Sequence, residues 1–147
     1  MKKMKKLLAL VLTLVLVGAT LTACGDSSTT DDDKTAEKYK IGIVQLVEHV
    51  ALDAATEGFK AAIIDELGED AVEFDYQNGQ NDSNTCSTIA NQFVSNKVDL
   101  IMANATPALQ AAAAATDEIP ILGTSVTEYG VALSISDFDG TVGGNIS

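Results

Sequence analysis

The chain has 147 residues, and its 21 acidic residues against nine basic ones give a formal net charge of −12 at neutral pH. Nucleic acids are bound through their phosphates by clustered lysine and arginine, so this charge excludes a nucleic-acid-binding protein. One histidine leaves no second imidazole for a histidine-based metal site, and we expect neither a bound metal nor a cofactor.

The first 23 residues have the order of a secretory signal peptide. Four lysines come first, an uncharged apolar run follows over residues 7–17, and mostly small residues fill positions 18–23. A membrane-spanning helix needs about 20 apolar residues. The uncharged stretch is slightly shorter and its last third is small and polar, so it indicates a cleaved signal.

The junction after this segment resembles a bacterial lipobox, with Leu21, Thr22 and Ala23 before Cys24. The resemblance implies that Cys24 is lipidated and becomes the first residue of the mature protein; the alternative is an ordinary secretory signal followed by a chance cysteine. The mature chain would have 124 residues, with five lysines against 21 acids. Anionic lipid repels such a surface, so we expect membrane contact to come from the lipid anchor. Residues 24–38 lack apolar side chains over 25–35 and predict an acidic, flexible tether.

Strand patterns recur along the rest of the chain. Apolar and β-branched runs predict strands over residues 39–47, 71–77, 98–104 and 119–126, with a possible fifth over 131–136.

Helix patterns lie between these strands. Apolar residues spaced by three and four (Leu52, Ala55, Phe59, Ile63 and Leu67) predict a helix over 51–67, which Gly68 ends. A second helix is predicted to start with Asp82 or Ser83 as its cap and to run to about Asn96. A third begins with Thr106 as the N-cap and Pro107 at the first helical position.

This alternation predicts an α/β domain over residues 39–147, with an open, mostly parallel sheet flanked by helices. Ligands of such sheets bind beyond the carboxyl ends of the strands. The candidate site therefore lies in four loops, residues 45–52, 78–84, 104–107 and 123–128.

The third loop is the most informative, because a strand leads directly into a helix there. The free N–H groups and the dipole of a helix N-terminus favour an anion such as a carboxylate. Thr106 either caps this helix only or also donates its hydroxyl to a ligand. No glycine-rich phosphate motif follows a predicted strand, so a nucleotide is disfavoured.

Catalytic motifs are sparse. Glu48 beside His49 could form an acid/base pair, but a lone loop histidine more often bonds to the start of a helix. No nucleophile-elbow motif occurs, so we expect no enzyme.

The second cysteine, Cys86, falls at helical spacing with Ile89, Ala90 and Phe93. This spacing predicts a buried structural thiol, since a nucleophilic cysteine would need a nearby histidine. With Cys24 lipidated, no intrachain disulfide can form.

Five segments in order resemble one family: EHVALDAATEGFKAAI, YQNGQND, ATPALQAA, PILGTSVTEYGVA and GGNIS. Together they look like the ABC-transporter substrate-binding lipoproteins of the tryptophan/tyrosine-type group, within the type I periplasmic-binding-protein fold. The resemblance implies two α/β lobes that close on a small ligand, with residues 39–147 as the N-terminal lobe and the second lobe missing. Val50 departs from the family, which usually has proline at this position of the first loop.

The resemblance also implies which residues line the ligand cleft: Gln45, His49, Asn81, Ala105, Thr106, Thr124 and Ser125. In related amino-acid binders a small residue and a threonine at a helix N-terminus hold the substrate carboxylate, which implies this role for Ala105 and Thr106. The implied ligand is an aromatic amino acid or a similar small solute.

The implied function is that of an extracytoplasmic, lipid-anchored protein on the bacterial cell membrane that delivers its solute to the permease and ATPase subunits of an ABC importer. One alternative is a solute sensor of the same fold that serves a membrane receptor. The other is an extracytoplasmic enzyme, whose turnover would depend on Glu48 or His49.

Overall fold

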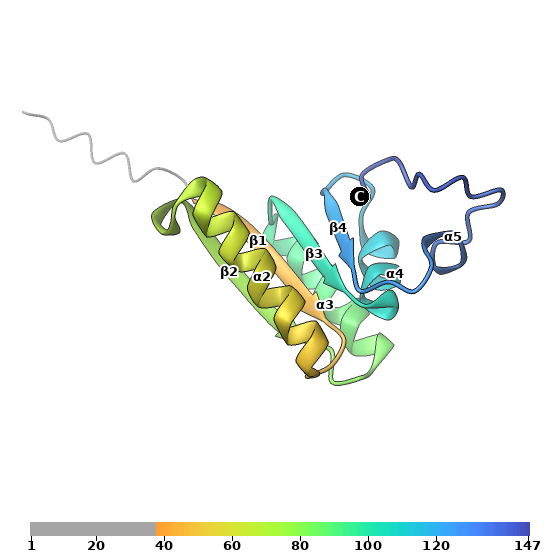
Figure 1. Cartoon of the computed structure of the whole chain (residues 1–147), viewed down its shortest axis with the longest axis horizontal. Coiled ribbons are helices and arrows are strands. Elements are labelled where there is room, and N and C mark those ends of the chain that lie inside the picture. The colour runs from red at the N-terminus through yellow and green to blue at the C-terminus, as the bar shows by residue number, and fades with distance from the viewer. Residues whose placement is uncertain (1–37) are drawn as a thin grey trace, which may run out of the picture. The chain divides into compact units, whose positions relative to one another are not determined.

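The computed structural model describes residues 38–147, which form one parallel sheet with helices on both faces (Figure 1). The strands lie in the order β2-β1-β3-β4, with bounds β1 (Tyr39–Gln45), β2 (Val72–Asn78), β3 (Leu100–Asn104) and β4 (Ile121–Thr124). The longer helices are α2 (Val50–Leu67), α3 (Ser83–Asn96) and α4 (Thr106–Ala115); two short ones are η1 (Glu69–Ala71) and α5 (Tyr129–Ala132). Helix α2 covers one face of the sheet, and α3 and α4 cover the other. The predicted fold class is confirmed.

Strand β1 lies in the middle of the sheet and sets its register. It pairs in parallel with β2 on one side and β3 on the other, and its last residue, Gln45, lies opposite Asn78 and Asn104. Asn104 in turn lies opposite Thr124 of β4. The four strands therefore end level with one another, and the loops that follow them share one edge of the sheet.

The larger part of the core lies under α3 and α4. Phe93, Ile101, Leu109 and Ile121 are almost completely buried there. A Cβ atom on Gly42 of β1 would lie 2.7 Å from the ring of Phe93. A glycine at this strand position therefore lets the phenyl ring lie directly on the sheet.

Helix α2 is attached to the opposite face in a different way. Of the five residues predicted to face the core, the first four are half-buried, but Leu67 at the C-terminal end is 44% exposed. The fully buried residue of this helix is a polar one, Thr56. Helix α2 is therefore held on the sheet by polar contacts near its N-terminus as well as by its half-buried apolar side chains.

The possible fifth strand over residues 131–136 is wrong. The carboxylate of Glu128 accepts hydrogen bonds from the backbone N–H groups of Gly130 (2.8 Å) and Val131 (2.6 Å), which caps the single turn of α5. The alternating apolar residues of this segment are typical of a strand and gave no indication of a short helix. Instead, Ile146 near the end of the chain forms a parallel bridge with Ile121 at the free edge of β4.

The predicted signal peptide, the lipidation site Cys24 and nearly all of the predicted tether lie outside the described residues. Across residues 38–147 no helix has the length and hydrophobicity needed to span a membrane.

Cys86 is completely buried on α3, as the helical spacing predicted. Burial raises the pKa of the Cys86 thiol, and the neighbouring Asp82 carboxylate raises it further. An unfolded thiol has a pKa of about 8.5. Above about pH 8.5 the unfolded chain loses the thiol proton, while the folded protein still holds it. The protonated thiol therefore contributes its full stability to the folded state below about pH 8.5, and this contribution is lost as the pH rises.

We expect the free energy of unfolding to fall more between pH 7 and pH 10 for the wild type than for Cys86→Ala. Urea unfolding at a series of pH values measures both curves. Parallel curves for the two proteins would contradict the prediction.

Candidate ligand-binding site

The four carboxyl-edge loops, residues 45–52, 78–84, 104–107 and 123–128, are joined by backbone hydrogen bonds. The N–H of Asn81 donates to the carbonyl of Leu46 (2.8 Å), which ties the second loop to the first. The N–H of Ala105 donates to the carbonyl of Thr124 (2.9 Å), which ties the third loop to the fourth. The structure thus brings the predicted site residues together along one edge of the sheet.

Three of these loops contain residues other than glycine in the left-handed region of backbone space. They are Gln80 (φ 53°) and Asn81 (φ 60°) after β2, Ala105 (φ 97°) after β3 and Ser125 (φ 55°) after β4. Such conformations cost on the order of 1–3 kcal/mol for bulkier residues and persist only where the surroundings enforce them. Three further residues of this kind, Lys97, Ser134 and Asp137, lie outside these loops.

The start of α4 provides donors for an anion. Ala105, not Thr106 as predicted, occupies the N-cap position, and it makes no side-chain capping bond. The first N–H groups of a helix have no partner within it. Pro107 has no N–H, so the first-turn donors without a hydrogen-bond partner among residues 38–147 are the N–H groups of Thr106 and Ala108. The Thr106 hydroxyl accepts a hydrogen bond from the N–H of Thr127 (3.4 Å), and its own proton stays available.

We expect Ala105→Gly to stabilise the protein by about 0.5–1 kcal/mol, because glycine adopts φ 97° without a Cβ clash. Ala108→Gly, three residues along the same helix, is the matched control and should cost about 1 kcal/mol. Urea unfolding measures both. A loss of stability in both variants would show that Ala105 is not strained.

Gln45 lies beneath the first loop and not at its surface. It is fully buried, and its Nε2 donates to the carbonyl of Val47 (2.9 Å) and to Oδ1 of Asp53 (2.6 Å). Its Oε1 accepts from the hydroxyl of Thr56 (2.7 Å) and from Nδ2 of Asn104 (3.3 Å). Both ends of the amide are used within the chain, so Gln45 positions the loop in this structure.

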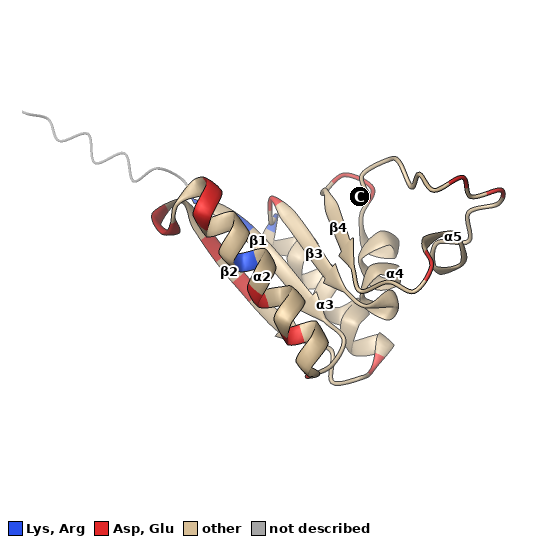
Figure 2. Cartoon of the chain, viewed as in Figure 1, with Lys and Arg blue, Asp and Glu red and all other residues tan. Residues whose placement is uncertain are grey.

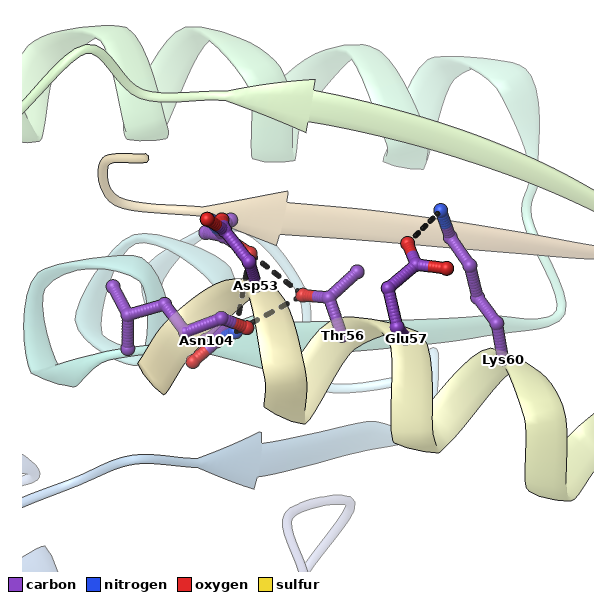
Figure 3. Close-up of polar contacts among 7 residues, drawn as sticks. Asp53, Thr56, Glu57, Lys60 and Asn104 are labelled. Atoms are coloured by element: carbon purple, nitrogen blue, oxygen red, sulfur yellow. Dashed lines mark hydrogen bonds and ion pairs between the residues drawn. The ribbon is translucent and has the colours of Figure 1, made fainter. Parts of the chain in front are cut away.

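Asn104 completes a polar cluster in which Gln45, Thr56 and Asn104 are buried and Asp53 is exposed. Figure 3 shows Asp53, Thr56 and Asn104 close together at the start of α2. Its Nδ2 also donates to the carbonyl of Leu52 (2.8 Å) and to Oγ1 of Thr56 (3.0 Å). Its Oδ1 is buried without a hydrogen-bond partner among the described residues. Sequence reasoning missed Asn104 as a structural residue, although a polar residue at the end of a buried strand was the available signal.

His49 is the N-cap of α2. Its Nδ1 accepts a hydrogen bond from the N–H of Ala51 (3.2 Å), and its backbone carbonyl accepts from the N–H of Asp53 (2.8 Å). The side chain is exposed, as is that of the adjacent Glu48. The structure confirms the prediction that this lone histidine bonds to the start of a helix.

Acidic residues are spread over the surface of the described domain, with few lysines among them (Figure 2). Three of those lysines, Lys38, Lys40 and Lys97, line a hollow of about 430 Å³. It lies at the amino edge of the sheet, across from the carboxyl-edge loops, and so does not belong to the candidate site. Within residues 38–147 no three His, Cys, Asp or Glu residues are grouped to hold a metal ion.

Residues 40–146 match the family model of the ABC transporter substrate binding proteins. The chain belongs to this family. It is 43% identical over 155 aligned positions to a tyrosine-binding protein of Clostridioides difficile strain R20291. This alignment covers 98% of this chain and 45% of that relative. The chain thus spans less than half the length of this curated relative.

Solved structures of the family have the same fold. A ligand-free, open substrate binding protein with adhesive properties from Clostridium difficile is 46% identical, with a TM-score of 0.67, over 74% of this chain and 37% of that one. An ABC domain from Streptococcus pneumoniae in complex with L-Trp is 31% identical, with a TM-score of 0.69, over 76% of this chain and 38% of that one. These relatives are substrate-binding proteins, which confirms the prediction that the chain is not an enzyme.

Proposed function

We propose that this protein is an extracytoplasmic, lipid-anchored binding protein that delivers an aromatic amino acid to an ABC importer. The start of α4 is the observation that carries the proposal. Ala105 is held at φ 97° with no side-chain cap, so the first turn keeps its donors free at the carboxyl edge of the sheet. A free amino acid always has a carboxylate, and these donors suit that group.

The choice of an aromatic ligand rests on the relatives. One of them is named as a tyrosine-binding protein, and another was solved with L-Trp. From the described lobe we assign Ala105 and Thr106 to the ligand carboxylate, with His49, Asn81, Thr124 and Ser125 around the cleft. Gln45 then acts beneath the loop and makes no direct ligand contact.

A second lobe would complete the site. We propose that the described domain forms one half of a clamp, in which the carboxyl-edge loops face a second α/β lobe and closure buries the ligand. A single lobe keeps only part of the contacts, so we expect this chain by itself to bind its ligand weakly.

A titration of the ¹⁵N-labelled 147-residue chain tests the carboxylate assignment. L-tyrosine should shift the amide resonances of Thr106 and Ala108, whereas tyramine, which lacks the carboxylate, should shift them at least tenfold less at equal concentration. Thr106→Ala should weaken the response and Thr106→Ser should preserve it. Absence of any response to all twenty amino acids would overturn the proposed function.

The lipid anchor has its own test. We expect the wild-type protein expressed in a bacterium to fractionate with membranes and to release a lipid-modified peptide that begins at Cys24. Cys24→Ser should release no lipid-modified peptide, because the sulfur that carries the two acyl chains of the stable attachment is absent. Cys86→Ser is the matched control and should release the same lipid-modified peptide as the wild type. Absence of a lipid-modified peptide from the wild type would contradict the anchor.

A further inference from the structure

A second hollow of about 350 Å³ lies at the carboxyl edge, between the first two loops. It is lined by Val47 and Glu48 of the first loop and by Asn78 and Gln80 of the second. Glu48 is exposed and makes no hydrogen bond or ion pair with any other residue in the range 38–147. The hollow therefore presents a free carboxylate beside one apolar wall and two side-chain amides.

The second loop is held rigidly in the conformation that forms this hollow. Gln80 (φ 53°) and Asn81 (φ 60°) are consecutive left-handed residues of a tight turn, closed by the N–H of Asp82 and the carbonyl of Gly79 (2.9 Å). Turns of this kind usually contain glycine, asparagine or aspartate, and glutamine is an uncommon choice. The side chain of Asn78 supports the turn by accepting from the N–H of Gln80 (2.7 Å).

The position of the hollow decides which part of a ligand can reach it. Helix α4 starts after β3, whereas the hollow lies between the ends of β1 and β2. Neighbouring strands lie about 4.8 Å apart, so the two places are separated by up to about 10 Å. The ammonium of an amino acid is attached next to its carboxylate and stays near α4. An extended aromatic side chain can span the distance to the hollow.

We infer that the hollow between the first two loops is the specificity subsite for the distal end of the ligand side chain, and that Glu48 selects a ring that bears a hydrogen-bond donor there. This inference rests on the proposed function. A carboxylate only accepts hydrogen bonds, so it complements the phenolic O–H of tyrosine. The phenylalanine ring has no hydroxyl, so it would displace water from the carboxylate without forming a hydrogen bond in its place.

The test compares L-tyrosine with L-phenylalanine, which differ only by the hydroxyl, in NMR titrations of the full 147-residue chain. We expect the wild type to bind tyrosine about tenfold more tightly, as a hydrogen bond to a charged group predicts. Glu48→Ala should reduce this ratio to about twofold or less, mainly by weakening tyrosine binding. Glu118→Gln, an exposed acid at the amino edge, is the control and should leave the ratio unchanged.

Two results separate the inference from the proposed function. If both amino acids shift Thr106 and Ala108 with equal affinity, or if Glu48→Ala keeps the wild-type ratio, the subsite is wrong while the carboxylate site stands. If L-lysine binds more tightly than L-tyrosine, Glu48 receives a cation and the assignment to a phenol is overturned. If neither aromatic amino acid shifts any resonance, the proposed function fails and the inference fails with it.

Discussion

Replacement of Gly79 by alanine is expected to cost about 2–4 kcal/mol of unfolding free energy. Gly79 is buried at the start of the second loop, and a Cβ atom there would overlap Sγ of Cys86. It would also lie 3.1 Å from the carbonyl oxygen of Leu46, which cannot move without breaking the hydrogen bond from Asn81. Urea unfolding gives the magnitude.

The same substitution elsewhere in the chain is the control. Gly58 lies within α2, and a Cβ atom there meets nothing within 4 Å. Gly58→Ala is therefore expected to stabilise the protein by about 0.5–1 kcal/mol through helix propensity. The double variant Gly79→Ala/Cys86→Ala should lose less than the sum of the two single losses, since only the sulfur contact is relieved. Strict additivity would show that the sulfur contact is not the cause.

The sheet was predictable because its signals are local. The apolar run of β3 is nearly continuous, as expected for a parallel strand covered on both faces, and Gly68 follows the last turn of α2 directly. The cap of α3 was also readable, since the Asp82 side chain accepts from the N–H of Asn84 (2.7 Å). The ends of the strands were predicted less accurately. Strand β3 begins at Leu100 and β4 covers four residues, because the pairing with the neighbouring strand covers fewer residues than the apolar run does.

The region after β4 could not be predicted in the same way. VALSIS alternates like a strand, but a chain forms a strand only if a neighbouring strand can pair with it. Tyr129 donates its hydroxyl to the carbonyl of Gly123 (2.8 Å), and Glu128 caps the turn that follows. These contacts depend on side chains reaching back to β4, and periodicity in the sequence does not record them.

The candidate site was predictable in position but not in detail. The rule that ligands bind at the carboxyl ends of parallel strands selects four loops, and the structure brings these loops together at one edge of the sheet. Whether a polar residue at that edge faces solvent or the interior depends on the face of the strand and on its partners. Gln45 was expected in the cleft, yet it lies opposite Asn104 beneath the loop. The strain at Ala105 is likewise set by the tertiary fold and has no signature in the alanine itself.

Asn104→Asp is expected to be the most damaging isosteric change in the described domain, costing about 3–5 kcal/mol at neutral pH. The substitution replaces the Nδ2 donor by an oxygen in the same place. That oxygen would face the carbonyl of Leu52 (2.8 Å) and Oε1 of Gln45 (3.3 Å), which are both acceptors. The Thr56 hydroxyl can turn to donate to only one of these oxygens, so acceptors would face each other in a site with no access to water.

The pH dependence of Asn104→Asp separates this charge effect from a packing defect. Burial raises the pKa of a carboxyl group above its unfolded value of about 3.9. The folded variant then binds a proton that the unfolded chain has released, so its deficit relative to the wild type should grow from pH 4 to pH 7. Asn91→Asp on the exposed face of α3 is the control, expected within about 0.5 kcal/mol of the wild type throughout. A deficit of Asn104→Asp that does not change with pH would mean that loss of the Nδ2 bonds, and not the buried charge, accounts for the damage. The cluster would then stabilise α2 on the sheet simply through those bonds.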